Sequence, residues 1–151
     1  MGATVEIAIL GTEEFRDFVN LFTKEARRKV NIAIVQGAHM IEASAKKYVP
    51  VDTGNLKSKI TVIKRDEAGR FVGKVTGEQI ISEVKVLANT NYAAYLEYGT
   101  KKMNAQPYMQ PALNENKNKI RAHVVNAVEE AKRSEMRKAY GAGLKFMRGI
   151  L

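Results

Sequence analysis

The tripeptide Asp52-Thr53-Gly54 is the part of the sequence that comes closest to a known catalytic motif. Aspartic peptidases carry a catalytic aspartate in this tripeptide, and two such aspartates share a proton during hydrolysis. A chain with one triplet would therefore have to dimerise to act. Retroviral-type peptidases also embed the triplet between apolar strand residues and need a later apolar-apolar-glycine segment. Here Pro50 precedes the triplet, and the only such segment, residues 71–73, follows too soon.

The same three residues are well suited to a turn. Aspartate can accept a hydrogen bond from the backbone two residues on, and glycine tolerates a positive φ. We therefore interpret residues 52–54 as a turn. The peptidase alternative predicts peptide cleavage that Asp52→Asn abolishes, and we expect no such cleavage.

The remaining residues that could do chemistry do not form a catalytic or metal-binding pattern. His39 and His123 lie on separate predicted helices, and the chain has no cysteine. No phosphate-binding glycine loop and no nucleophile elbow is present. We predict no catalytic residues, no metal and no cofactor, and hence no enzyme.

Two long amphipathic helices are expected to position the rest of the chain. Apolar and small residues recur at steps of three and four from Phe15 to Tyr48, which predicts a helix of about 35 residues. Thr12 suits its N-cap and Pro50 ends it. A second periodic run predicts another long helix, with Pro111 in its first turn. The apolar positions of this second run are Leu113, Ile120, Val124, Val128 and Ala131.

Between the two helices the apolar period changes to two. Segments 58–64, 70–76 and 83–89 alternate and are separated by turn-like residues, which predicts an antiparallel meander of three strands. Residues 5–10 could form a further short strand. A short helix follows at 91–99, with Gly99 as its C-terminal stop.

The predicted fold is α+β, with two long helices packed against a three- to four-stranded antiparallel sheet. We expect residues 1–151 to form one domain, in which the glycine-punctuated segment 141–151 is a flexible tail or an arm that orders on a partner. No apolar run approaches the roughly 18 residues that span a bilayer, so we expect no contact with a membrane. The chain start also lacks the pattern of a signal peptide, which favours an intracellular product.

The net charge of +9 is concentrated in the last third of the chain. Residues 101–151 carry 11 Lys or Arg against 4 Asp or Glu. Such asymmetry indicates an acidic partner, either nucleic acid or the acidic face of a protein. A well-solvated basic helix is the alternative. One group of basic residues is predicted to face a partner: Lys132, Arg133, Arg137 and Lys138.

Three segments, "YVPVDTGNLKSKI", "VLANTNYAAYLEYGT" and "AQPYMQPAL", together carry a family resemblance. In order and spacing they resemble the head–tail joining, or tail-completion, neck proteins of long-tailed double-stranded DNA bacteriophages and prophages. The resemblance covers about residues 48–113. Tyr108 stands where the family usually has Phe, and Gln110 where a basic residue is common. The matching positions are Pro50, Asp52, Thr53, Gly54, Leu56, Tyr92, Ala93, Glu97, Gly99, Thr100, Pro107, Pro111 and Ala112.

The resemblance implies a non-enzymatic subunit of the virion that assembles in the host cytoplasm. It implies a ring of six or twelve copies at the neck, or at the head-proximal end of the tail, in contact with other neck, connector and tail proteins. DNA would pass through the lumen without sequence recognition, and no small-molecule substrate is expected. For Glu97, a solvated helix end and a loop-anchoring role both remain open. A nonspecific DNA-binding module using the basic C-terminal helix is the alternative function.

Overall fold

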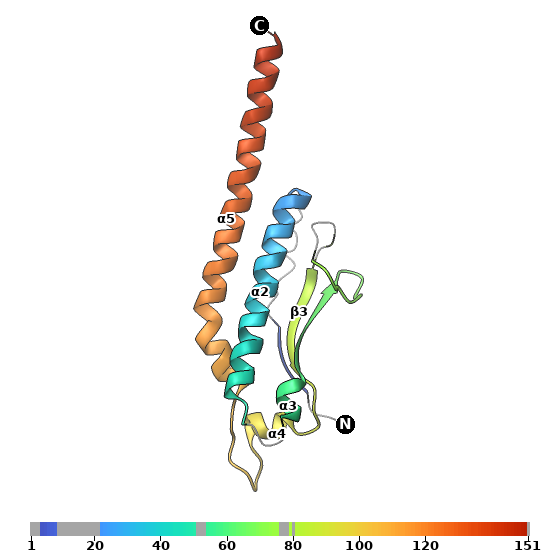
Figure 1. Ribbon diagram of the computed structural model, residues 1–151, viewed down its shortest axis with the longest axis vertical. Coiled ribbons are helices and arrows are strands. Elements are labelled where there is room, and N and C mark those ends of the chain that lie inside the picture. Colours follow the sequence, from blue (N-terminus) through green and yellow to red (C-terminus); the bar gives the residue numbers. More distant parts are fainter. Residues whose placement is uncertain (1–3, 9–21, 51–53, 76–78, 80, 151) are drawn as a thin grey trace.

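The computed structural model describes residues 4–8, 22–50, 54–75, 79 and 81–150, with the backbone alone for residues 7–8 and 142–150. The α+β fold expected from the sequence is confirmed: it has two long helices and a three-stranded antiparallel sheet, with α2 lying between the sheet and α5 (Figure 1). Along the chain the elements are β1 (Val5–Ala8), α2 (Lys24–Tyr48), α3 (Asn55–Ser58), β2 (Ile60–Asp66), β3 (Ile81–Ala88), α4 (Ala93–Tyr98) and α5 (Met109–Ile150).

The sheet has the strand order β1-β3-β2, so the last strand in sequence is the central one. Ala88 of β3 pairs with Val5 on one side and with Ile60 on the other. One face of β3 is buried, with Val84, Val86 and Ala88 fully shielded, as the period of two requires for a sheet covered on one side. That face packs against α2.

The predicted strand at 70–76 is wrong. Among its described residues the contacts with β2 are the bridge between Arg65 and Phe71 and two backbone hydrogen bonds, from Asp66 N–H to the Arg70 carbonyl and from Val72 N–H to the Lys64 carbonyl. Because β3 pairs directly with β2, this segment does not lie between them as the predicted meander requires. The segment instead forms a tight reversal after β2.

The side chain of Asp66 stabilises this reversal of the chain. Its carboxylate accepts hydrogen bonds from the backbone N–H groups of Ala68 (3.0 Å) and Arg70 (2.9 Å), and pairs with the Arg70 guanidinium at 2.8 Å. Gly69 supplies the positive φ, +76°, that the turn needs. The N–H and guanidinium of Arg70 hold the pKa of the Asp66 carboxyl below its ordinary value of 3.8.

Because folding lowers the pKa of the Asp66 carboxyl, the free energy of unfolding should decrease as the solution becomes acidic. The contribution of Asp66 to stability is present above about pH 4 and is lost as the pH falls through its folded-state pKa. We expect Asp66→Asn to lose less stability than the parent chain between about pH 6 and about pH 3, measured by urea unfolding. Glu67→Gln, on the exposed side of the same turn, is the control. Identical pH dependence in Asp66→Asn and the parent would contradict this account.

Helix α2 begins at Lys24 rather than near Thr12, so the predicted helix of about 35 residues is wrong in length. Thr23 has the extended backbone of an N-cap, and its hydroxyl accepts from Ala26 N–H at 3.5 Å. A helix cannot run continuously through such a residue. The expected start at Thr12 lies outside the described residues. The end is as predicted: Val49, before Pro50, is extended.

Helices α2 and α5 run side by side and in opposite directions (Figure 1). Tyr48 at the end of α2 donates to Glu115 at 2.8 Å, while Thr23 at its start donates to Glu135. Between these ends the helices meet closely at Gly37. A Cβ built on Gly37 would lie 2.8 Å from Cγ2 of Ile120. The small residue therefore sets how closely the two helices approach.

Enlarging Gly37 is expected to push the helices apart. Gly37→Leu should lower the free energy of unfolding by about 2–3 kcal/mol, since overpacking costs more than the helix propensity gained. Denaturation followed by circular dichroism measures this. Ile120→Ala in the Gly37→Leu background should recover part of the loss by making room. If the double variant is as unstable as the sum of the single changes, the contact is not what limits residue 37.

Helix α5 starts as predicted, with Pro111 in its first turn, and continues through Ile150. Residues 141–150 of the expected tail or arm are therefore helical, although glycines at 141, 143 and 149 are poor helix formers. Lys138 pairs with Glu25 of α2 at 2.6 Å, and beyond this point α5 extends past the start of α2 (Figure 1). Whether the segment acts as an arm stays a prediction.

Candidate functional site

A buried carboxylate joins α4 to α5 at the lower end of the molecule in Figure 1. Glu97 is 5% exposed, and its Oε2 accepts from the backbone N–H groups of Tyr108 (2.8 Å) and Met109 (2.9 Å). Its Oε1 accepts from Gln110 N–H at 2.9 Å. These donors belong to the first turn of α5, where no backbone carbonyl is available to them. A negative charge there also complements the helix dipole.

The local sequence explains why Glu97 points inward. Ala93 and Glu97 are one helical turn apart and are the buried residues of α4. Gly99 then ends the helix with a φ of +76°. The chain then reverses direction between Thr100 and Met103, which form an isolated antiparallel β-bridge. It returns along α4, where Gln106 N–H donates to the Leu96 carbonyl at 2.8 Å.

Tyr108 fills the space between α4 and α5. Its side chain is fully buried, and its hydroxyl donates to the Ala93 carbonyl at 3.5 Å. Burial, together with the nearby charge of Glu97, raises the pKa of the Tyr108 phenol far above its ordinary value. The ring is therefore a neutral packing group. Met109 and Ala112, also buried, complete the contact at the base of α5.

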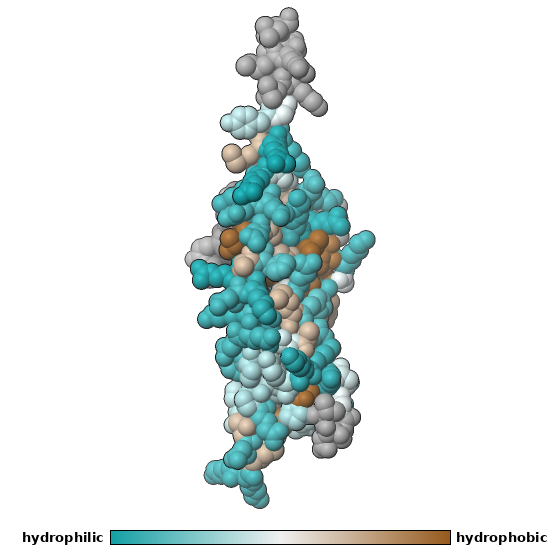
Figure 2. Space-filling model, turned by 60° about the vertical axis from the view of Figure 1, so that its left-hand side comes forward, coloured by the Kyte–Doolittle hydropathy of each residue, from teal (hydrophilic) through white to brown (hydrophobic). Residues whose placement is uncertain are grey.

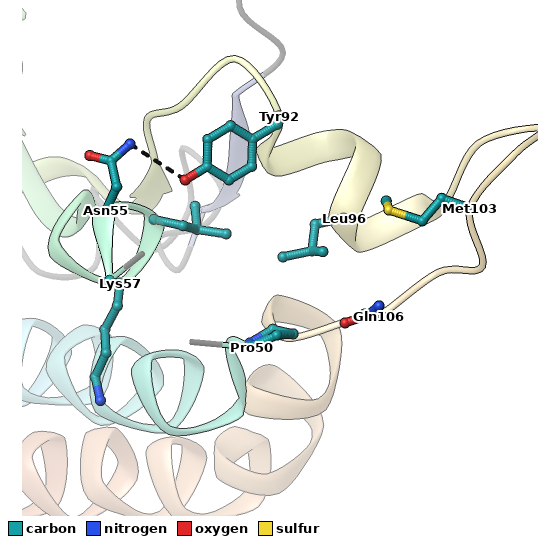
Figure 3. Close-up of a pocket in the computed structure, with 9 residues that line it drawn as sticks. Pro50, Asn55, Lys57, Tyr92, Leu96, Met103 and Gln106 are labelled. Carbon is teal, nitrogen blue, oxygen red and sulfur yellow. Dashed lines mark hydrogen bonds between the residues drawn. The ribbon is translucent and has the colours of Figure 1, made fainter. Parts of the chain in front are cut away.

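Glu97 and its three backbone hydrogen bonds to the start of α5 are called the clamp below. A groove of about 580 Å³ opens beside this clamp, between α3, α4 and the loop that precedes α5. Leu96 points into the space between α3 and Pro50, and Asn55 donates to the Tyr92 hydroxyl at 3.4 Å across one side (Figure 3). The described residues that line the groove are Pro50, Gly54, Asn55, Leu56, Lys57, Tyr92, Leu96, Met103 and Gln106. Its size falls within the range of ligand and peptide pockets.

Three exposed tyrosines lie on and just before α4, and the first of them, Tyr92, lines the groove. Tyr92, Tyr95 and Tyr98, spaced three residues apart, are 40%, 55% and 75% exposed. Their positions on and just before α4 follow from the burial of Ala93 and Glu97 on the other side of the helix. Met103 adds an exposed apolar side chain from the loop. Exposed aromatic and apolar residues grouped around a concavity are typical of a docking surface.

The structure brings parts of all three sequence segments to this end of the molecule. From the first segment Pro50, Gly54 and Leu56 line the groove, while Asp52 and Thr53 lie outside the described residues. From the second, Tyr92 lines the groove and Glu97 anchors α5.

The third segment forms the loop end and the first turn of α5. Pro107 is exposed just before the helix, whereas Pro111 is half-buried and Ala112 fully buried within it. Gln110 stands where the family commonly has a basic residue, and its backbone N–H donates a hydrogen bond to Glu97.

Sequence reasoning missed five groove residues, namely Asn55, Lys57, Leu96, Met103 and Gln106. Leu96 belongs to the short helix α4, and the other four come from the short helix α3 and from an irregular loop, neither of which carries a periodic signal. The triple spacing of Tyr92, Tyr95 and Tyr98 was visible in the sequence and could have indicated a group of exposed aromatic residues.

The four basic residues predicted to face a partner do not form one patch. The Lys138 Nζ lies 2.6 Å from the Glu25 Oε2, on the side of α5 that faces α2. Arg133 and Arg137 lie one turn apart on an exposed side, and Arg133 approaches Glu129 at 3.8 Å. Lys132 is exposed as well. On the side of the molecule that α5 covers, hydrophilic residues predominate (Figure 2).

The histidines are separate from this site. His39 contacts Glu42 at 2.8 Å on the exposed side of α2, and His123 is exposed on α5. In the described part of the chain, no three potential metal ligands gather at one place. No helix there is both long and apolar enough to cross a bilayer.

The chain is a small α+β protein with a groove and three exposed tyrosines at one end. Comparison with known proteins gives its family. The family model described as "Bacteriophage HK97-gp10, putative tail-component" matches residues 13–99, more than half of the chain, and the chain belongs to this family. Searches of curated proteins and of solved structures found no match.

Family membership makes the chain a structural phage protein of a tail-component family, and a tail component contacts other phage proteins. The resemblance to a phage head–tail joining and tail family noted in the sequence is thereby confirmed. The matched residues include the first of the three segments and all of the second except Thr100, so the third segment and α5 lie beyond the match.

Proposed function

We propose that the protein is a subunit of the phage neck that assembles as a ring of six or twelve copies and joins the tail to the DNA-filled head. DNA would pass through the lumen of the ring without sequence recognition. The observation that carries the proposal is the family match, combined with the placement of unlike surfaces at opposite ends of the molecule.

Opposite ends of different chemistry suit a ring. The three exposed tyrosines and the groove lie at one end, and the far end of α5 projects from the other (Figure 1). A ring subunit needs a heterologous interface, in which one surface meets a different surface of its neighbour. A chain with two unlike ends can also contact one layer of the particle above the ring and another below it.

The alternative function is a nonspecific DNA-binding module. The abundance of lysine and arginine on α5 favours it. Against it, the charge is distributed around the helix, and part of it pairs with Glu25 and Glu129. A DNA-binding module predicts duplex binding by the purified protein that falls steeply with salt. Weak binding without a steep salt slope supports the neck role.

Neutralising the basic end of α5 should separate protein contact from DNA contact. We expect a variant with glutamine at Lys132, Arg133, Arg137 and Lys138 to reduce head–tail joining several-fold while filled heads retain their DNA, since a gripping lumen would oppose sliding. Particle counts by electron microscopy and packaged DNA give the two readouts. Glutamine at Lys117, Lys119 and Arg121, nearer the start of the same helix, is the control. Normal joining by the first variant would contradict this assignment of the basic residues.

Electron microscopy of particles from cells that lack the gene tests the proposed function. Filled heads beside unattached tails, rescued by the gene supplied in trans, are the expected result. Intact infectious virions from the deletion would overturn the neck role. Empty heads alone would instead indicate a step before joining.

A further inference from the structure

The groove beside Glu97 combines an apolar floor with a polar and basic margin. Leu56, Leu96 and Met103 supply apolar surface, and Leu56 is itself buried. Asn55 and Gln106 add amide groups at the edge. Such a composition fits a protein segment that inserts one apolar side chain and keeps polar groups at the rim.

One lysine lines the groove, and two more directly precede the lining residue Met103 in the sequence. Lys57 lines the groove, and Lys101 and Lys102 form the turn that leads into Met103. All three are exposed, and within the described residues none of them has an ion-pair partner. The groove therefore presents net positive charge beside an apolar floor.

We propose that this groove binds an acidic segment of another phage structural protein, with an apolar anchor side chain between Leu56, Leu96 and Met103. Carboxylates of the segment lie near Lys57 and the 101–102 turn, and the three exposed tyrosines pack along it. This inference rests on the proposed joining function, since it names the chemistry of the partner that the subunit meets at its α4 end. Electrostatic complementarity of this kind selects partners and speeds their encounter.

Two other occupants fit less well. The projecting end of α5 in a second copy carries Lys145 and Arg148 and no acidic residue from 139 onward, so it would meet like charge at the groove. Duplex DNA is a poor match because stable binding requires many phosphate contacts along a surface, whereas the groove is a concavity with an apolar floor. An acidic protein segment satisfies both the charge and the shape.

Photo-crosslinking in phage-producing cells tests the proposal. The photoreactive residue p-benzoylphenylalanine replaces Tyr95, which is exposed on α4 and directly precedes the groove residue Leu96, or, as a control, Phe71, an aromatic residue that is 71% exposed on another part of the surface. Adducts are mapped by mass spectrometry. Each substitution is also combined with Lys57→Glu, Lys101→Glu and Lys102→Glu. Circular dichroism of the purified triple variant checks that it folds like the parent.

Tyr95 adducts should map to a stretch rich in Asp or Glu on a different phage protein and fall about tenfold in the triple variant, with Phe71 adducts unchanged by it. Adducts on residues 139–151 of a second copy, adducts on DNA, or yields insensitive to charge reversal would overturn the proposal. So would a Tyr95 yield no higher than that of Phe71. If the deletion strain shows unjoined heads and tails while these adducts fail, the groove inference falls alone. Intact virions from the deletion remove the neck role itself.

Discussion

Glu97→Ala is expected to lower the free energy of unfolding by about 4 kcal/mol. The change removes a buried carboxylate that accepts three backbone hydrogen bonds from Tyr108, Met109 and Gln110. Tyr108 and Met109 are themselves buried, so water cannot readily replace the lost acceptor. Urea unfolding followed by circular dichroism measures the loss. Because the start of α5 depends on these bonds, head–tail joining should fall with it.

Two variants separate the charge of Glu97 from its hydrogen bonds. Glu97→Gln keeps an acceptor oxygen but removes the charge, so we expect roughly half the loss seen for alanine. Glu129→Ala removes an exposed carboxylate that lies 3.8 Å from Arg133 on α5, and we expect a change within about 0.5 kcal/mol. Equal stability of Glu97→Ala and Glu129→Ala would show that the clamp contributes nothing.

Gly99→Ala is expected to lower the free energy of unfolding by about 3 kcal/mol. Two costs add. The φ of +76° disfavours any side chain, and a Cβ at this position would lie 2.8 Å from Ala105 N and 2.9 Å from the Met103 carbonyl oxygen. Both atoms are backbone, so relief requires the loop that carries the groove wall to move. Thermal unfolding of the purified variant gives the magnitude.

Gly69→Ala is the matched control for the steric cost. Gly69 has the same φ of +76°, but a Cβ there would have nothing within 4 Å. Its substitution should cost about 1 kcal/mol, from backbone conformation alone. A difference of about 2 kcal/mol between the two variants measures the clash at Gly99 together with the backbone cost of its ψ of 179°. If both variants lose the same amount, the loop accommodates the methyl group and the tight packing at Gly99 is not essential.

Glu97 illustrates how far the sequence could predict the candidate site. Its position before Gly99 at the end of a short helix was readable from local patterns, and these left open whether it is solvated or anchors a loop. The answer depends on the first turn of α5, which begins 12 residues later and supplies the donors. Such a contact is tertiary, and no periodicity within either segment encodes it.

The sheet shows the same limit for strand pairing. Alternation correctly predicted the strands that became β2 and β3, but it also predicted a strand at 70–76. A period of two reports that one face of a segment is apolar and does not report which neighbour it pairs with. The edge of β3 is taken by β1, from the other end of the sequence. Pairing over that separation is decided by the packing of the whole sheet on α2.

The start of helix α2 was predicted wrongly for a different reason. Both Thr12 and Thr23 are followed by a glutamate within two residues, so both carry the signal of a helix start. The apolar spacing runs past Thr23 without interruption and favoured the earlier position. Capping contacts at Thr23, including its hydroxyl bond to Glu135 of α5, identify the later one. The deciding partner again comes from a remote part of the chain.

The length of α5 turns the clamp at its base into the pivot of a lever. With 42 residues at a rise of 1.5 Å each, the helix is roughly 60 Å long. A tilt of only about 5° at the base would therefore displace the far end by about 5 Å. The contact with α2 holds the helix as far as Lys138, where it pairs with Glu25, so α2 would have to tilt with it. Strain applied at the α4 end would then appear as movement of both helices at the opposite end, some tens of ångströms away.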